Sequence, residues 1–163
     1  MDTLAAQVGA ALKAHGMMLA TAESCTGGGM AQAVTDIAGS SEWFERGFVT
    51  YTNQAKIEML GVRQSTLDAY GAVSEMTVRE MAAGAISHSH AHIALAVSGI
   101  AGPGGGTPEK PVGTVWFAWA FRHGDVQVSR YQLAGDRAAV RAQSVEIALQ
   151  GVLDSLKNLS KTT

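Results

Sequence analysis

The stretch MMLATAESCTGG, residues 17–28, contains the pattern that decides the fold. Its first part, Met17–Ala22, is a short apolar run of the kind that forms a buried strand. A polar turn, Glu23–Thr26, follows, and glycines then open a helix that we expect over Gly27–Ile37. A strand that passes through a glycine-rich turn into a helix is the repeating unit of α/β proteins. The segment therefore predicts an α/β fold.

Strands and helices alternate on both sides of this segment. Upstream, apolar residues spaced three and four apart predict a helix over Asp2–His15, which Gly16 ends. Downstream, we expect a strand over Trp43–Thr52, helices over Asn53–Leu60 and Ser65–Tyr70, and a helix capped by Ser74 that runs to about His88. A strand over Ile93–Val97 and a hairpin of Val115–Phe121 and Val126–Leu133 follow. The last expected helix is capped by Asp136, runs from Arg137 to about Leu156, and is followed by a frayed tail. This order predicts a three-layer α/β/α sandwich with a mixed, mostly parallel sheet, in a single domain over residues 1–163.

The composition limits the classes of function. The chain has 163 residues, a net charge of -2 and 1 cysteine. Such a charge gives no general attraction to nucleic acid or to anionic lipid, and a lone cysteine fits a reducing compartment. No segment resembles a signal peptide, and no apolar run approaches the roughly 20 residues that span a bilayer. We expect a cytoplasmic protein without nucleic-acid or membrane partners.

The turn that holds Ser24 is the first candidate site. It follows the carboxyl end of a predicted strand, where open α/β sheets bind ligands. Backbone N–H groups of the helix start over Gly27–Gly29 can hold a phosphate or an oxyanion, and Ser24 can act as a nucleophile. The alternative is that Ser24 or Thr26 only caps the helix while the glycines ease packing. The segment matches neither a Walker loop nor a Gly-x-Ser-x-Gly elbow.

A serine nucleophile needs a base, and the histidines are poorly placed to supply one. His88, His90 and His92 precede a strand, at the edge of the sheet opposite to the ligand side. No carboxylate or cysteine near them supports a metal site, so we expect neither a metal nor a cofactor. Lys56 lies one turn after a strand, where desolvation and the helix dipole favour a neutral amine, and Tyr51 can relay or orient the proton. An ordinary solvated lysine is the alternative.

A second glycine cluster, Ser98–Thr107, leaves another buried strand. A loop of this composition is either a flexible lid or a close-fitting ligand cradle, and Ser98 adds a hydroxyl at the strand end. Arg137 and Arg141 share one face at the start of the last helix, where arginine suits a phosphate. The alternative for these arginines is a surface pairing with Asp136.

Together these segments resemble the competence/damage-inducible protein A (CinA) C-terminal domain family. The resemblance covers the chain from about Leu4 to about Leu156. It is carried, in order, by TAESCTGG at 21–28, GSS-x-WF-x-RGFVTY at 39–51, Lys56, GAVSE at 71–75, SGIAGP at 98–103, KPVGTV at 110–115 and GDR at 135–137.

The resemblance implies hydrolysis of the carboxamide of nicotinamide mononucleotide to nicotinate mononucleotide and ammonia, a step in pyridine nucleotide recycling. By position, Ser24 matches the family's nucleophile, Lys56 its base and Tyr51 its assisting tyrosine. Ser98 stands where other members can carry threonine, and Arg137 matches a basic residue near the nucleotide phosphate. The expected substrate-binding set is Glu23, Thr26, Gly27, Gly28, Ser98, Gly99, Arg137 and Arg141.

Two other functions stay open at this point. One is a non-catalytic nucleotide-binding or interaction module linked to competence or the DNA damage response, and the other is an amidase for a different substrate. We also expect a homo-oligomer, specifically a dimer, whose interface would suit Trp43, Phe44 and Trp116.

Overall fold

The computed structural model describes residues 3–161, in which strands form one mixed sheet in the order β2-β1-β3-β4-β5. These strands are β1 (Leu19–Glu23), β2 (Phe44–Val49), β3 (Ile93–Gly99), β4 (Thr114–Phe121) and β5 (Val126–Gln132). β1 pairs in parallel with β2 and β3, whereas β4 is antiparallel to both β3 and β5. The mixed sheet is therefore confirmed, and β4 is the strand that runs against the others.

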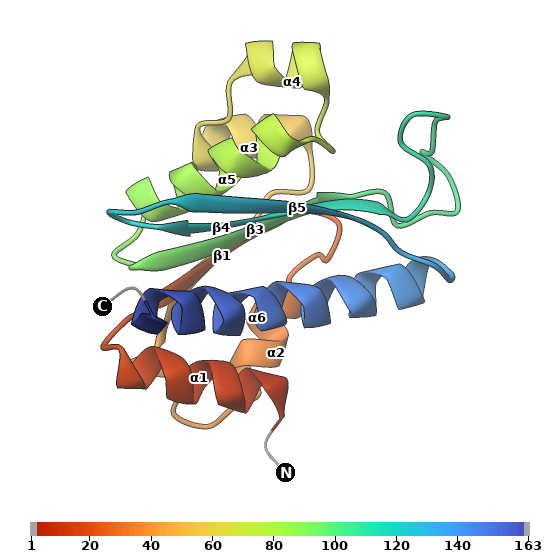
Figure 1. Ribbon diagram of the computed structural model, residues 1–163. Helices are drawn as coiled ribbons and strands as arrows, with labels where there is room; N and C mark the ends of the chain where they lie inside the picture. The colour runs from red at the N-terminus through yellow and green to blue at the C-terminus, as the bar shows by residue number, and fades with distance from the viewer. Residues whose placement is uncertain (1–2, 162–163) are drawn as a thin grey trace.

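Helices cover both faces of the sheet, which confirms the three layers (Figure 1). α1 (Leu4–Ala14), α2 (Gly29–Thr35) and the long α6 (Arg137–Lys161) lie on one face. α3 (Asn53–Leu60), α4 (Gln64–Tyr70) and α5 (Glu75–Ser87) lie on the other. None of the helices within residues 3–161 is long and apolar enough to cross a membrane.

The two faces of the sheet differ in side-chain size, which explains how the helices pack. Large side chains such as Leu95, Phe117 and Trp119 point toward α1 and α6 and form the larger core. Alanines, including Ala22 and Ala96, face α5, and small side chains let that helix lie close to the sheet. Both sides of the central strands are thus buried, as expected for strands covered by two layers of helices.

Three sequence expectations need correction. The last helix does not end near Leu156; it continues to Lys161, because nothing between these residues breaks a helix and Leu156 is anchored in the core. Trp43 is not an interface residue: it is 3% exposed, and its ring lies against Gly9. The first helix begins at Leu4, with the Thr3 hydroxyl as its cap, whereas the predicted start at Asp2 lies outside the described residues.

The topology brings three strand ends to one edge of the sheet. β1, β2 and β3 are mutually parallel, so the segments that follow Glu23, Val49 and Gly99 emerge side by side. The first leads into α2, the second into α3, and the third into a long loop that reaches β4. These three connections form the candidate site.

Candidate active site

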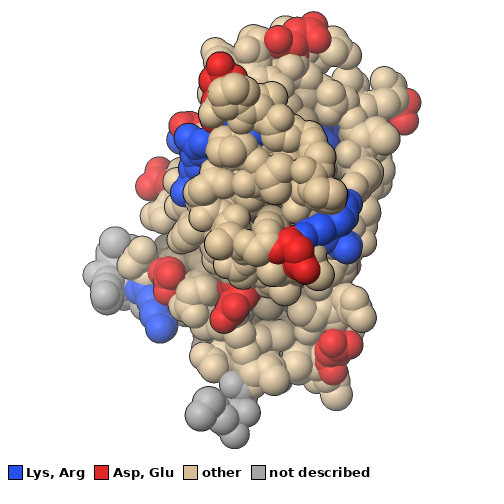
Figure 2. Space-filling model, turned by 90° about the vertical axis from the view of Figure 1, so that its right-hand side faces the viewer, with Lys and Arg blue, Asp and Glu red and all other residues tan. Residues whose placement is uncertain are grey.

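A pocket of about 280 Å³ lies at this edge of the sheet. Six of the residues predicted from the sequence line it, namely Ser24, Tyr51, Lys56, Ser98, Gly99 and Arg137. Figure 2 shows the end of the molecule onto which these connections open, where charged side chains of both signs are scattered over a largely uncharged surface. The site is therefore a local arrangement of polar groups and not a broad charged patch.

The turn after β1 holds Ser24 by backbone hydrogen bonds on both sides. The Ser24 N–H donates to the Val97 carbonyl over 3.2 Å, and the Gly27 N–H donates to the Ser24 carbonyl over 3.0 Å. Gly27 and Gly28 have φ values of 58° and 99°, a backbone region that favours glycine. The chain thus turns sharply after Ser24, which is 7% exposed and faces the pocket.

Lys56 reaches the same point from α3. Its side chain is buried, and its Nζ lies 3.1 Å from Ser24 Oγ, 3.2 Å from the Thr50 carbonyl oxygen and 3.3 Å from the Tyr51 carbonyl oxygen. A neutral amine has two hydrogens and one lone pair. The two carbonyls can accept both hydrogens, which leaves the lone pair directed at the Ser24 hydroxyl. This is the geometry of a nucleophile and its base.

Burial acts on the two titratable groups beside Ser24 in opposite directions. It lowers the pKa of Lys56 below the ordinary lysine value, because the charged ammonium loses its hydration. It raises the pKa of the neighbouring Cys25 thiol to about 11. The thiol is therefore protonated and poorly nucleophilic near neutral pH, whereas the lysine is biased toward its proton-accepting form.

Glu23, which the sequence predicted to bind substrate, does not line the pocket. The side chain is fully buried, and its carboxylate accepts hydrogen bonds from the Met30 N–H, the Ala31 N–H and the Thr26 hydroxyl. The carboxylate therefore occupies the start of α2, which a ligand phosphate would otherwise approach. The Thr26 hydroxyl donates to the same carboxylate, and Thr26 is 2% exposed and does not line the pocket.

The helix start offers fewer free N–H groups than the sequence predicted. The Gly27 N–H donates to Ser24 and the Gly29 N–H donates to the Thr26 carbonyl over 3.0 Å. Neither Gly27 nor Gly28 lines the pocket. Among the described residues, the N–H groups of Cys25, Thr26 and Gly28 donate to no backbone carbonyl, so three backbone donors of the turn remain open.

Tyr51 and Arg137 interact across the mouth of the pocket. Arg137 Nη2 donates to the Tyr51 hydroxyl over 3.0 Å, and Nη1 donates to the Gly102 carbonyl over 2.9 Å. Tyr51 contacts Lys56 through its backbone carbonyl and not through its hydroxyl. The geometry does not support a proton relay through the Tyr51 ring. The contact instead joins the start of α6 to the glycine-rich loop.

Arg141 lies one helical turn after Arg137 but contacts a different part of the site. Its Nε donates to the Cys25 carbonyl over 3.1 Å and its Nη2 donates to the Thr26 carbonyl over 3.3 Å. It does not line the pocket. Both arginines line a neighbouring hollow of about 540 Å³, so the expectation that they face a phosphate together stays a prediction, although Arg141 also holds the turn behind Ser24.

The sequence missed some of the pocket wall. Asn53, at the first position of α3, and the segment Ala72–Val73, before α5, both line it. Ala72 and Val73 belong to the GAVSE stretch that carries the family resemblance, but neither they nor Asn53 are part of a glycine cluster or a charged pair. Asn53 is one turn before Lys56, and its position on the same helix is the one clue that could have identified it.

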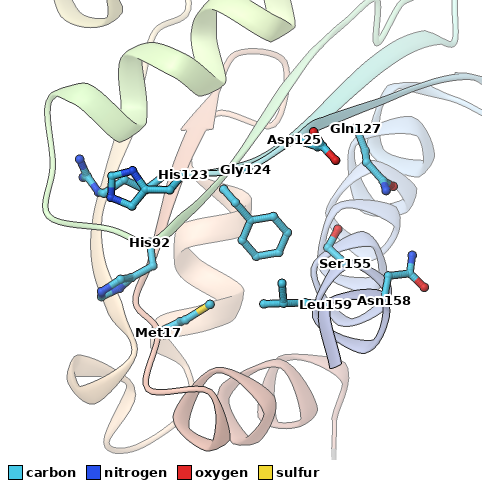
Figure 3. A pocket seen from close by; sticks show the side chains of 11 residues that line it. Met17, His92, His123, Gly124, Asp125, Gln127, Ser155, Asn158 and Leu159 are labelled. Carbon is cyan, nitrogen blue, oxygen red and sulfur yellow. The ribbon is translucent and has the colours of Figure 1, made fainter. Parts of the chain in front are cut away.

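The histidines lie at the opposite end of the sheet. His92 and His123 line a separate hollow of about 420 Å³ beside the end of α6, shown in Figure 3. His92 Nδ1 accepts a hydrogen bond from the Met18 N–H over 3.0 Å. Within residues 3–161, no cluster of three or more His, Cys, Asp or Glu side chains has an arrangement that could hold a metal ion. The chemistry at Ser24 has Lys56 as its nearest base.

Known proteins are similar to this chain over almost its whole length. The model of the CinA C-terminal domain matches residues 1–156. The nicotinamide-nucleotide amidohydrolase PncC of Enterobacter agglomerans is 57% identical over 159 residues, which cover 97% of both chains. The protein of the same name from Escherichia coli K12 is 59% identical over 147 residues, 90% of this chain and 89% of its own.

A crystal structure shows the same fold. The competence/damage inducible protein CihA from Agrobacterium tumefaciens superposes with a TM-score of 0.91 at 48% sequence identity, and the match covers 94% of this chain and 93% of that one. The shared fold therefore extends over nearly the whole chain.

Proposed function

The chain belongs to the CinA C-terminal domain family, and from this premise we propose that it is a nicotinamide-nucleotide amidohydrolase with Ser24 as nucleophile and Lys56 as base. The substrate class follows the names of its relatives. The assignment of the two residues rests on one observation, the 3.1 Å separation of Lys56 Nζ and Ser24 Oγ, with two backbone carbonyls beside the amine.

The reaction begins with proton transfer from Ser24 to neutral Lys56. Ser24 Oγ attacks the carboxamide carbon of nicotinamide mononucleotide, and the carbonyl oxygen becomes an oxyanion. Protonated Lys56 then gives its proton to the departing nitrogen, so the C–N bond breaks and ammonia leaves an ester on Ser24. Lys56, neutral again, takes a proton from water as the water attacks this ester, and it returns that proton to Ser24 Oγ as the ester C–O bond breaks. The products are nicotinate mononucleotide and free Ser24.

The rest of the pocket suits the rest of the nucleotide. Ser98 is buried at the end of β3 and places a hydroxyl beside Ser24, where it can orient the carboxamide. Gly99 and the following loop let the backbone approach the ligand closely. Arg137 lies at the mouth, where its guanidinium can meet the phosphate of the substrate.

We also propose that residues 1–163 act as a single domain, as a homodimer in the cytoplasm, without a nucleic-acid or membrane partner. The small net charge, and the scattered charges on the face that Figure 2 shows, support the absence of a polyanionic partner. Light scattering of the purified chain tests the dimer, since a monomeric mass would contradict it.

The function is tested by incubating the purified chain with nicotinamide mononucleotide and measuring both products. We expect ammonia and nicotinate mononucleotide in equal amounts, and little ammonia from free nicotinamide or glutamine. Binding without turnover would contradict the proposal and favour a non-catalytic nucleotide-binding module. Faster turnover of another amide would instead identify a different substrate for the same site.

A further inference from the structure

Arg141 is placed to control the backbone that follows Ser24. It extends from α6 and donates to two consecutive carbonyls, those of Cys25 and Thr26, over 3.1 and 3.3 Å. Gly27 makes this approach feasible, since a Cβ at that position would lie 3.1 Å from Arg141 Nη2. Arg141 is exposed and lines a second hollow together with Arg137, but both of these hydrogen bonds go to the turn that follows Ser24.

The peptide between Cys25 and Thr26 is the middle peptide of the turn that the Gly27 N–H closes onto the Ser24 carbonyl. In a planar trans peptide, the N–H points opposite to the C=O. Because Arg141 holds the Cys25 carbonyl toward α6, the Thr26 N–H is directed away from α6. Lys56 reaches Ser24 from α3, on the other face of the sheet (Figure 1). The Thr26 N–H thus points toward the side where Ser24 meets its base.

The Thr26 N–H is also free. Among residues 3–161 it donates to no backbone carbonyl, and the same holds for the Cys25 N–H, whereas the N–H groups of Ser24, Gly27 and Gly29 all donate to backbone carbonyls. A free, preorganised N–H two residues after a serine nucleophile can stabilise the oxyanion. A cation bound to the carbonyl of the same peptide polarises that peptide and strengthens its N–H as a donor.

We propose that Arg141 is a positioning residue which fixes the peptide between Cys25 and Thr26, so that the Thr26 N–H donates to the oxyanion formed at Ser24. This inference rests on the proposed function, because it assumes attack by Ser24. It assigns Arg141 a part in the rate of the reaction and none in binding the phosphate, which distinguishes it from Arg137.

The test measures kcat and KM for ammonia release in Arg141→Met and Arg141→Lys, with Arg79→Met as a control at an exposed ion pair on α5. Arg141→Met is expected to lower kcat at least fivefold while KM changes less than threefold. Arg141→Lys is expected to recover part of kcat, since an ammonium can still donate to one carbonyl. The midpoint of urea unfolding checks that each variant is folded.

Labelling of Ser24 by a probe that is not the substrate tests the role of Arg141 independently of the proposed function. A fluorophosphonate probe reacts with an activated serine, and its own developing oxyanion needs the same N–H donor. We expect Arg141→Met to slow labelling of Ser24 by a factor similar to the loss in kcat, even if nicotinamide mononucleotide proves to be the wrong substrate. If Arg141→Met fails to fold, the same comparison is made with Arg141→Lys.

Three results would overturn the inference. A KM raised tenfold at unchanged kcat would identify Arg141 as a phosphate ligand. Wild-type kcat, KM and labelling rate in Arg141→Met would show that the contact has no role in the reaction. An absence of both ammonia release and Ser24 labelling in the wild-type chain would remove the proposed function together with this inference.

Discussion

At the scale of single residues, the proposed mechanism depends on the protonation state of the Lys56 amine. Lys56 Nζ is enclosed by Ser24 Oγ and two backbone carbonyl oxygens, all neutral groups. No carboxylate among the described residues forms an ion pair with it, so nothing compensates the cost of burying its charge. The lowered pKa of Lys56 is the direct consequence, and it matches the requirement for a base near neutral pH.

The pH dependence of the reaction tests whether neutral Lys56 is the active form. Because the neutral amine is the active form, kcat/KM should rise with pH along a single ascending limb whose midpoint lies below 10.5, the ordinary lysine pKa. Lys56→Met should lose about 10²-fold or more in kcat and should lack this limb. A variant that keeps the ascending limb would assign the base to another group.

The same pKa has a consequence for stability. The folded-state pKa of Lys56 lies below its unfolded value of 10.5, so folding disfavours the protonated amine. The penalty is fully present below the folded-state pKa, and it disappears as the pH rises from there toward 10.5. The free energy of unfolding of the wild-type chain, relative to Lys56→Met, should therefore increase across that window in urea titrations. A constant difference would contradict the lowered pKa.

Sequence reasoning found Ser24 and Lys56 because both follow strands whose carboxyl ends meet. It did not give the direction of the Glu23, Thr26 and Arg141 side chains, which lie within or beside the same turn. Strand and helix patterns tell which segments come together, whereas the direction of a side chain depends on hydrogen-bond partners that only the folded turn presents. Glu23 has such partners in α2, and its carboxylate therefore points away from the pocket.

At the scale of elements, Glu23 is the link between β1 and α2. It is the last residue of the strand, yet its carboxylate satisfies two N–H groups in the first turn of the helix. A short helix such as α2 depends strongly on such a cap, since its initial N–H groups have no partner within the helix. The cap also fixes the angle at which the Ser24 turn leaves the sheet.

Glu23→Gln should therefore act mainly on stability. The amide provides one acceptor oxygen where the carboxylate has two, and its NH₂ group would face a backbone N–H. We expect the free energy of unfolding to fall by about 2–3 kcal/mol in urea denaturation. The exposed Glu146→Gln on α6 serves as the control, with a change within about 0.5 kcal/mol. Unchanged stability together with a raised KM would contradict this expectation and would indicate that Glu23 binds substrate.

Most elements could be predicted because their signals are local. The helix Asn53–Leu60 was predicted with its observed bounds, and Ser74 and Asp136 cap their helices as expected. The short 3-10 helix Ser40–Glu42 was missed, since the Gly39-Ser40-Ser41 break hides it. The end of α6 was misjudged because a helix without a stop signal continues as long as packing supports it.

At the scale of the whole molecule, one end of the sheet carries the site and the other end carries contacts that stabilise the fold. The carboxyl ends of β1–β3 carry the site, and the opposite end carries a clamp built on Arg122 at the end of β4. Its Nε donates to the Ala91 carbonyl and its Nη2 to the carbonyls of Ile86 and Ser89, each over 2.8 Å. These bonds join the end of α5, the start of β3 and the β4–β5 turn.

The Arg122→Met variant tests whether the stabilising contacts at one end of the sheet are independent of the site at the other end. The loss of three charged hydrogen bonds to backbone carbonyls should lower the free energy of unfolding by about 2 kcal/mol or more. The site lies at the other end of the sheet, so kcat and KM should stay within twofold of the wild-type values. Arg130→Met, which removes a single exposed contact to the Glu109 carbonyl, is the matched control with little effect. A large loss of kcat in folded Arg122→Met would show that the ends are coupled.

The central claim is that Ser24 is the nucleophile of an amidohydrolase. Its most direct test is the rate of ammonia release from nicotinamide mononucleotide by Ser24→Ala, compared with wild type at equal concentration and with matching urea unfolding curves. Removal of one buried hydroxyl oxygen leaves the backbone bonds of the turn in place, so the variant should fold. The account predicts a rate at least about 10³-fold lower. A rate within tenfold of wild type would contradict it.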